Sequence, residues 1–420
     1  MKKVTLLKSM VLALSLSLFS PIISAKADPV TVPKIYAKSA VVIDMDTMEV
    51  ILDLNSEDKM YPASTTKLMT AILLAENKSK EENLTYTKSA KDQPAYSLNA
   101  SVKPINIGTT MTAGDVMKAL LLYSANDSAY IIADNVATDS DSFIKMMNEK
   151  AEEFGMKNTN FVTANGLHNE NHYSTALDLA ILGKKSYDNP WVRETLSIKE
   201  DSIQLPSNDK FLMENRNKYL GENGNLGGKT GYTTEAGKCF VSIYERDGRK
   251  LVSVVLKSIF DGEDLAMFND TEKIIDASYS AKKTIIINKD DIVETLPIQY
   301  KSFRFFGPSK TIDVPLIVKE DIEYYENPIN KKYLEKDINT AGLNPWKLDK
   351  NLSAGKLTLK EPLSSKKYIL YPNVSKSDLL KANLLVYIGT LICAILIIAI
   401  IFFLNSKVKR NKRKSKKRYF

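Results

Sequence analysis

The sequence has few of the residues that build metal centres and disulfide frameworks. Its 420 residues include only two cysteines and two histidines. Two cysteines exclude a disulfide scaffold and a Cys-rich zinc module, and two histidines argue against a His-based metal site. We therefore expect neither a metal nor another cofactor. The hydrophobic fraction of 44% and the charged fraction of 26% are those of a globular protein, and the length allows two or three domains.

Acidic residues are absent from both ends of the chain, and this absence explains the formal net charge of +8. Residues 406–420 hold nine Lys and Arg, residues 1–27 hold four, and residues 28–405 hold 45 basic against 50 acidic side chains. The central part is therefore mildly acidic. Because the basic footprint of a nucleic-acid-binding protein would have to lie on this folded part, we expect no nucleic-acid partner.

The two ends have the patterns of membrane targeting and anchoring. Residues 1–27 combine a basic start, an apolar run and small residues before Asp28, which is typical of a secretory signal peptide; a buried N-terminal helix is the alternative. Residues 384–404 carry no charge and at about 1.5 Å per residue reach roughly 30 Å, the thickness of a bilayer core. The basic tail, residues 405–420, follows directly. Basic residues next to a membrane span remain on the cytoplasmic side of the membrane.

These ends predict a single-pass protein of the cell membrane, with the body outside and the tail in the cytoplasm. The C-terminal anchor would contact membrane lipid. The tail would either touch anionic lipid as well or act only as a stop-transfer signal. Cys239 lies in the body and Cys393 in the span, so we do not expect them to pair.

Hydrophobic patterns predict a mixed α/β domain over residues 33–280. A β-hairpin is expected at residues 39–54, and a second one is expected to join two apolar runs across Asp247-Gly248, a strong hairpin signal. Helices are expected between the hairpins, in the segment that follows Ser64 and over residues 113–137 and 141–154. Strands at both ends with helices between them favour one mixed domain.

The pattern changes after residue 283. Residues 284–372 contain short β-like runs at 284–287, 312–318 and 356–359, which are separated by Pro, Gly and Asn turns. This pattern predicts a small all-β domain. Residues 375–381 would then link it to the membrane span.

Three short motifs in the first domain carry the chemical signal. They are Ser64-Thr65-Thr66-Lys67, Ser124-Ala125-Asn126 and Lys229-Thr230-Gly231. The Ser-x-x-Lys pattern recurs at seven other places and alone is no evidence, whereas Lys-Thr-Gly occurs once. The signal lies in the order of the motifs and in their spacing of 60 and then 105 residues.

Ser64 has the context of a nucleophile. It precedes a long apolar helix, so its hydroxyl would lie at the positive end of the helix dipole, with Lys67 on the same face. A serine hydroxyl needs a base beside it, and a lysine serves when burial and neighbouring cations lower its pKa. Lys229 is a candidate for such a neighbour. The alternative for Ser64, taken alone, is a plain N-cap residue.

The triplet resembles the motifs of the penicillin-recognising serine acyltransferases. The chain is most similar to the low-molecular-mass penicillin-binding proteins that are D-alanyl-D-alanine carboxypeptidases. The similarity covers residues 33–280 well, with Ala125 standing where the family usually has Gly. It implies a β-lactamase/transpeptidase-like domain of an antiparallel sheet with helices, followed by the small all-β domain and a C-terminal transmembrane helix. Longer matching stretches lie at residues 61–67, 163–167, 172–176 and 228–233.

The resemblance implies catalysis through an acyl-enzyme. Ser64 would attack the carbonyl between the two terminal D-alanines of a peptidoglycan stem peptide, and Lys67 would take its proton. Ser124 would relay a proton to the leaving amine, with Lys229 tuning it electrostatically. β-Lactam antibiotics would acylate the same serine as inhibitors.

The resemblance also implies a set of substrate-binding residues. Asn126 would bind a substrate amide and hold the first lysine in place. Lys229 and Thr230 would receive the terminal carboxylate of the substrate, and Gly231 would let the substrate backbone approach an edge strand. The backbone N–H of Tyr232, with that of the serine nucleophile, would form the oxyanion hole.

His168 and His172 are spaced like metal ligands on a helix, but their surroundings argue against that function. Asn169 makes a helix unfavourable there, and Glu170 stands one place too late for a His-Glu-x-x-His motif. We predict structural hydrogen bonding for these histidines, and a structural role for Asp127 as well.

Two other functions compete with the carboxypeptidase. A β-lactamase would need a Glu that activates the deacylating water, and no convincing Glu-x-x-x-Asn loop follows Ser124. A catalytically silent penicillin-binding sensor of the same fold is the second, although the motif residues are all intact. Whether a carboxypeptidase of this kind also acts as an endopeptidase or transpeptidase stays open at this point.

Overall fold

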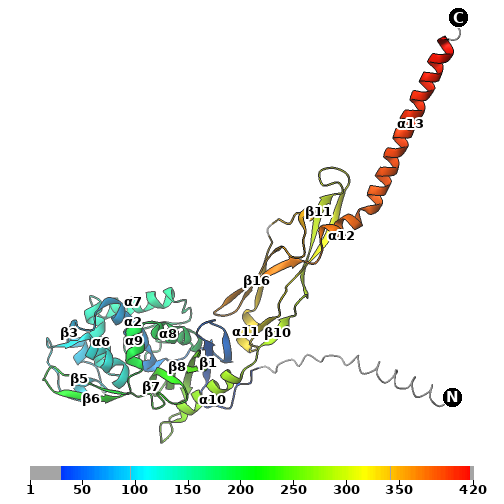
Figure 1. The fold of residues 1–420 in the computed structure, drawn as a ribbon. Coiled ribbons are helices and arrows are strands. Elements are labelled where there is room, and N and C mark those ends of the chain that lie inside the picture. Colours follow the sequence, from blue (N-terminus) through cyan, green and yellow to red (C-terminus); the bar gives the residue numbers. More distant parts are fainter. Residues whose placement is uncertain (1–29, 95, 341, 417–420) are drawn as a thin grey trace, which may run out of the picture. The chain divides into compact units, whose positions relative to one another are not determined.

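The computed structural model describes residues 30–94, 96–340 and 342–416, so the expected signal peptide, residues 1–27, lies outside the described residues. Figure 1 shows two units with different architectures. Of the described residues, the first consists of residues 30–46 together with Val50–Thr284 and Tyr324–Asn327. The second consists of Thr47–Glu49, Ile285–Glu323 and the chain from Pro328 onward.

The centre of the first unit is a five-stranded antiparallel sheet. Both expected hairpins are confirmed: β1 pairs with β2, and β8 pairs with β9. Asp247 and Gly248 join the second pair and both have positive φ, which two-residue hairpin turns require. The strands lie in the order β2-β1-β9-β8-β7, which leaves β7 at an edge. Their bounds are β1 Ser39–Asp44, β2 Val50–Leu54, β7 Asn225–Thr233, β8 Gly237–Arg246 and β9 Arg249–Ser258.

Helices cover both faces of this sheet (Figure 1). Helix α10 (Ala266–Ser280) packs on one face, where Phe240 of β8 meets Phe268 with ring centroids 5.2 Å apart. Helix α8 (Ala176–Asp188) packs on the other face. Because side chains alternate along a strand, Val241 points to the face opposite that of Phe240. Gly183 allows this close packing: a Cβ atom there would lie 2.7 Å from the Val241 side chain. With both faces covered, β7 forms one of the two edges of the sheet, and β2 forms the other.

The remaining helices of the first unit lie between β2 and β7 in the sequence. The helix expected over residues 113–137 is present but interrupted, since Ser124 adopts a left-handed conformation with φ +70°. The elements that position the motifs are η1 (Ala63–Thr66), α2 (Lys67–Asn77), α5 (Ala113–Lys118), the π-helix η2 (Ala119–Tyr123) and α6 (Asn126–Val136). The others are β3 (Asn83–Thr85), α3 (Lys88–Lys91), α4 (Leu98–Ser101), β4 (Thr110–Thr112), α7 (Ser140–Glu153), α9 (Pro190–Leu196), β5 (Glu200–Gln204) and β6 (Lys210–Glu214).

The second unit contains a five-stranded antiparallel sheet with its own core. The strand order is β11-β12-β16-β15-β14, and buried residues such as Val314, Leu316 and Leu357 form the core. The β-like runs expected at 284–287, 312–318 and 356–359 correspond to β10, β12 and β15. The bounds are β10 (Thr284–Ile287), β11 (Ile292–Lys301), β12 (Ser309–Ile317), β13 (Ile322–Tyr324), α11 (Pro328–Tyr333), β14 (Glu335–Asn339), η3 (Pro345–Lys347), β15 (Gly355–Lys360) and β16 (Ser365–Pro372).

Two consecutive helices end the described chain. The segment expected to link the β-rich part to the membrane forms helix α12 (Lys376–Ala382), because Ser375 and Asp378 build a capping box at its start. Helix α13 (Leu384–Lys416) then continues without a break through the expected span and into the basic tail. It is one helix, among the described residues, that is long and apolar enough to cross a membrane. The expected fold class, a mixed α/β domain with a small all-β domain and a C-terminal apolar helix, is thus confirmed.

Candidate active site

A short 3₁₀ turn places Ser64 beside Lys67. Pro62 leads into the turn, Ala63 has φ +47°, and helix α2 begins at Lys67. The Lys67 side chain is completely buried, and its Nζ lies 2.8 Å from Ser64 Oγ. The N-cap alternative for Ser64 is therefore wrong: neither η1 nor α2 has a side-chain cap, and the Ser64 hydroxyl contacts the lysine instead.

The Lys67 amine has two further hydrogen-bond partners. Its Nζ lies 3.0 Å from Asn126 Oδ1 and 2.8 Å from the carbonyl oxygen of Asn165. Burial, followed by the charge of Arg216, lowers the pKa of Lys67 to about 7, although the Asp127 carboxylate partly opposes this shift. A neutral amine has two N–H groups for the two acceptors and one lone pair for the serine hydroxyl. The geometry therefore suits a general base.

The second motif lies at the break between η2 and α6. Ser124 turns the chain with its positive φ, and Asn126 begins α6 while its backbone N–H donates to the carbonyl oxygen of Tyr96 at 2.8 Å. Both Ser124 and Asn126 are largely buried, and both line a cavity of about 600 Å³ that Ser64 also lines. The break in the helix is thus what presents this motif to the cavity.

The third motif lies on the edge strand β7. Lys229 is 1% exposed, and its Nζ donates to the carbonyl oxygen of Thr230 at 3.0 Å. Burial, then the charges of Lys67 and Arg216, hold the pKa of Lys229 well below its ordinary value. Thr230 and the two residues after it, Gly231 and Tyr232, line the same cavity. The structure therefore brings the eight candidate residues together: six line the cavity, and the two lysines are buried next to it.

Arg216 is a cavity residue that sequence analysis missed. Its guanidinium lies 5.2 Å from the ring centroid of Tyr96 and 5.1 Å from that of Tyr123, and it lines the cavity with Ser64. Its charge lowers the pKa of both Lys67 and Lys229. A lone arginine in a polar segment after β6 gives no sequence signal, because its function depends on the folded arrangement.

A second cationic group bounds the cavity beyond Tyr232. The Nζ of Lys238 lies 4.8 Å from the ring centroid of Tyr232 and 4.6 Å from that of Phe260, and it forms an ion pair of 2.5 Å with Asp264. All four residues line the cavity. This wall is amphipathic, so it suits a substrate with both apolar and polar parts.

His172 forms the structural hydrogen bonds that were predicted for it, whereas His168 makes a ring contact. Nδ1 of His172 accepts hydrogen bonds from the backbone N–H groups of Val162 and Thr163 at 3.0 and 3.2 Å. Nε2 then carries the proton and donates to Thr66 Oγ1 at 2.9 Å. Burial lowers the pKa of His172 to about 4, so the ring stays neutral. His168 packs its ring edge-on against Tyr61, and the described residues contain no cluster of His, Cys, Asp or Glu that could hold a metal.

Asp127 has a structural role too. The Asp127 carboxylate accepts the backbone N–H groups of Leu98 and Asn99 and the hydroxyl of Tyr86, at 2.9 to 3.0 Å. It thereby ties helix α4 to the start of α6.

Cys239 and Cys393 are both free, and burial raises the pKa of the Cys239 thiol to about 11, which makes it unreactive.

Comparisons with known proteins agree with this geometry. A family model described as D-alanyl-D-alanine carboxypeptidase matches residues 26–259, more than half of the chain and all three motifs. D-alanyl-D-alanine carboxypeptidase DacF of Bacillus subtilis (strain 168) is 27% identical over 387 residues, which cover 91% of this chain and 96% of the relative. Penicillin-binding protein D2 from Listeria monocytogenes, solved in its cefotaxime-bound form, is 32% identical with a TM-score of 0.52, over 59% of this chain and 98% of its own.

A likeness of fold reaches beyond the part of the chain that the family model matches. Penicillin-binding protein 5 from Haemophilus influenzae aligns with 82% of this chain and 98% of its own at a TM-score of 0.58, with 23% identity. This likeness concerns the fold, and it reaches beyond the part that the family model matches. From the family match and the arrangement of its three motifs, the chain belongs to the D-alanyl-D-alanine carboxypeptidase family.

Proposed function

We propose that this protein is a serine-type D-Ala-D-Ala carboxypeptidase that removes the terminal D-alanine from peptidoglycan stem pentapeptides. The observation that carries the proposal is the contact between Ser64 Oγ and Lys67 Nζ at 2.8 Å, with the remaining lysine hydrogens directed to Asn126 and Asn165. This arrangement supports an activated serine nucleophile. A relative that aligns with 91% of the chain carries the name of this activity.

In the acylation step, Ser64 Oγ attacks the carbonyl carbon of the penultimate D-alanine while its proton moves to Lys67 Nζ. The pKa of about 7 keeps a large fraction of Lys67 neutral at physiological pH, so the base is available. The negative charge that develops on the carbonyl oxygen is stabilised by the backbone N–H groups of Ser64 and Tyr232. Gly231 supports this role, because it lets β7 lie close to the backbone of Ser64.

In the second half of acylation, the C–N bond breaks and the terminal D-alanine leaves as an amine. Ser124 relays to this amine the proton that Lys67 took from Ser64, and Lys229 tunes Ser124 electrostatically. Thr230 and Lys229 receive the carboxylate of the departing residue, and Arg216 adds a further positive charge to the same cavity. Asn126 binds a substrate amide and positions Lys67.

Water then hydrolyses the ester on Ser64 and releases the shortened peptide. A β-lactam acylates the same serine, and we propose that its acyl-enzyme is long-lived. The penicillin-binding relative solved in cefotaxime-bound and ampicillin-bound forms supports this proposal. A β-lactamase and a silent sensor remain the competing functions.

We also propose that the protein is anchored by residues 384–404 in the cell membrane, with the catalytic domain, residues 33–280, outside and the basic tail, residues 405–420, in the cytoplasm. The length and hydropathy of α13 support the span, and the position of the basic residues supports the orientation. The β-rich domain, residues 284–372, would act as a spacer between the anchor and the catalytic domain.

Product analysis tests the catalytic proposal. The full chain in detergent micelles should release D-alanine from a synthetic pentapeptide that ends in D-Ala-D-Ala. Ser64→Ala should abolish this release and labelling by a fluorescent penicillin, while the melting temperature stays close to that of the wild type. A protein that binds penicillin but releases no D-alanine would be a sensor, and one that turns over penicillin rapidly would be a β-lactamase.

A further inference from the structure

The β11–β12 hairpin ends in an aromatic tip that the proposed reaction does not use. The tip consists of residues 302–308, and it is closed by hydrogen bonds from Ser302 N–H to the carbonyl oxygen of Pro308 and from Phe303 N–H to that of Phe306. The rings of Phe303 and Phe306 stack with centroids 5.1 Å apart. Phe305 and Phe306 are nevertheless 75% and 66% exposed, which is unusual for two large apolar side chains side by side.

A hydrogen bond and a ring contact hold this tip to the first turn of the apolar helix α13. The Tyr387 hydroxyl donates to the carbonyl oxygen of Ser302 at 2.7 Å, and its ring centroid lies 5.3 Å from that of Phe303. On the strand below the tip, the Tyr300 hydroxyl donates to Asn383 Oδ1 at 3.2 Å, one residue before α13 begins. The tip therefore cannot move freely along the helix axis.

This attachment fixes the depth of the tip relative to a membrane. Tyr387 is the fourth residue of α13, so it lies roughly 5 Å along the axis from the first apolar residue, Leu384. If α13 crosses the bilayer, as proposed above, the tip lies where the hydrocarbon core meets the headgroups. Aromatic side chains gather at this level in membrane proteins, since their rings are apolar and their polar atoms reach water.

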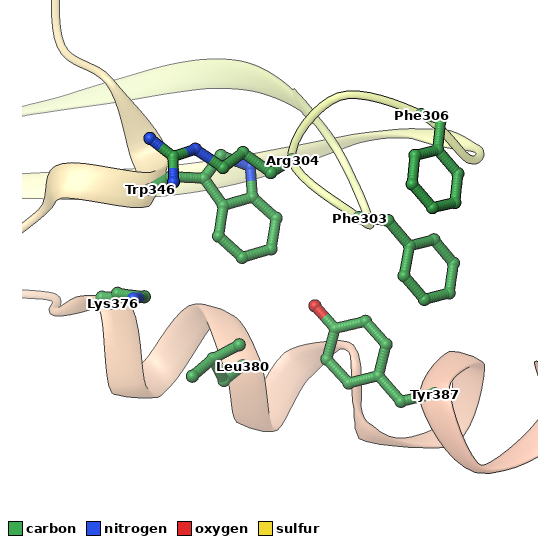
Figure 2. A pocket seen from close by; sticks show the side chains of 7 residues that line it. All are labelled: Phe303, Arg304, Phe306, Trp346, Lys376, Leu380 and Tyr387. Carbon is green, nitrogen blue, oxygen red and sulfur yellow. The ribbon is translucent and has the colours of Figure 1, made fainter. Parts of the chain in front are cut away.

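A cavity of about 400 Å³ lies between the tip and helix α12 (Figure 2). Phe303 and Tyr387 lie at one end of it in the figure, and Arg304 and Lys376 at the other. The described residues that line the cavity include these two cations and no carboxylate. The Arg304 guanidinium also lies 5.0 Å from the ring centroid of Phe305, which keeps a cation next to an exposed apolar ring.

We propose that this tip is a second membrane contact, in which Phe305 and Phe306 insert among the lipids of the outer leaflet while Arg304 and Lys376 bind a phospholipid headgroup phosphate. The occupant is a lipid because the surface continues that of the spanning helix and has the same order of apolar and cationic groups as the membrane interface. The inference rests on the proposed membrane anchor. It adds a site that fixes the orientation of the β-rich domain on the membrane.

A site-specific fluorophore tests insertion. The full chain carrying Cys239→Ala and Cys393→Ala, with Phe305→Cys labelled by the polarity-sensitive dye NBD, is reconstituted into vesicles of phosphatidylglycerol and phosphatidylcholine. The matched control is Glu320→Cys, because Glu320 is exposed and follows the other end of β12, about 30 Å from the tip at roughly 3.3 Å per residue. The label at 305 should shift to the blue and be quenched by lipids that carry a spin label near the headgroup, whereas the label at 320 should remain water-exposed.

The outcomes separate the tip from the anchor. If the protein floats with the vesicles and resists extraction by carbonate but the two labels are equally exposed to water, the membrane contact of the tip is overturned while the anchor stands. A chain that does not incorporate would overturn the anchor and, with it, this inference. Penicillin labelling of both variants should equal that of the wild type, which reports an intact catalytic domain.

A charge substitution tests the phosphate part of the site. In the protein labelled with NBD at position 305, Arg304→Gln together with Lys376→Gln should lower the quenching of NBD fluorescence by headgroup-labelled lipid at least twofold. Lys336→Gln together with Lys356→Gln removes two exposed charges of the same β-rich domain outside the cavity and should leave the quenching unchanged. Equal quenching in both double variants would remove the two cations from the proposed site.

Discussion

Gly231 on the edge strand lies against the backbone of Ser64: a Cβ atom at this position would be 2.9 Å from the Ser64 nitrogen and 3.0 Å from the Pro62 carbonyl oxygen. Both neighbours are backbone atoms, so they cannot rotate away as a flexible side chain would. Gly231→Ala should therefore push β7 from the serine turn and distort the proposed oxyanion hole. We expect acylation by a fluorescent penicillin to slow about 10²-fold, the effect of roughly 1 Å of misplacement at a reacting centre.

The matched control is Gly262→Ala, where a Cβ atom would meet nothing within 4 Å. This variant should acylate at the wild-type rate. The melting temperatures of both variants should be measured, because a slow Gly231→Ala protein with an unchanged melting temperature attributes the loss to the site. Wild-type acylation by Gly231→Ala would mean that the approach of the strand to Ser64 has no catalytic importance.

The lowered pKa of Lys67 predicts the pH dependence of acylation. If neutral Lys67 is the base, the second-order rate constant should rise about tenfold per pH unit below pH 7 and level off above it, since the folded pKa is about 7. Lys67→Ala should lower the rate constant by about 10²–10⁴-fold and abolish this rise. The measurement is penicillin labelling by stopped flow across this range, and a profile that is flat through pH 7 would exclude Lys67 as the titrating base.

Arg216 should shift that profile, because its charge is the second largest cause of the lowered pKa of Lys67. Arg216→Gln removes the charge, so the pKa of Lys67 should rise and the midpoint of the profile should move to higher pH. Arg193→Gln is a suitable control: Arg193 also lies over a tyrosine ring, that of Tyr187 at 5.4 Å, but it does not line the cavity. Equal midpoints in the two variants would show that Arg216 does not act on Lys67.

Local patterns predicted much of the fold and led to the motifs. Apolar alternation on both sides of Asp247-Gly248 was enough for the β8–β9 hairpin, since two-residue turns have a strong sequence signal. The uncharged run at residues 384–404 was enough for α13. In both cases the sequence signal and the structure depend on the same few neighbouring residues.

Features that depend on distant parts of the chain were not predictable in this way. The carbonyl oxygen of Asn165 that holds Lys67 comes from 98 residues away and leaves no side-chain pattern. Arg216 acts through a charge that only the fold brings near the lysines. Sequence analysis assigned no secondary structure to the linker at residues 375–381, although the Ser375–Asp378 capping box was a local signal of its helix.

His172 should make the stability of the catalytic unit sensitive to acid. Its pKa is lowered from 6.5 to about 4 in the folded protein by burial, so between these values the unfolded chain binds more protons and the free energy of unfolding falls as pH falls. The loss should be about 3 kcal/mol in total, at about 1.4 kcal/mol per pH unit. Urea unfolding across this range should show a shallower slope for His172→Gln, which cannot gain the proton. His168→Gln should change the slope less than His172→Gln does, because the charge of His168 is a smaller cause than burial of the lowered pKa of His172, and equal slopes in all three proteins would contradict the assignment.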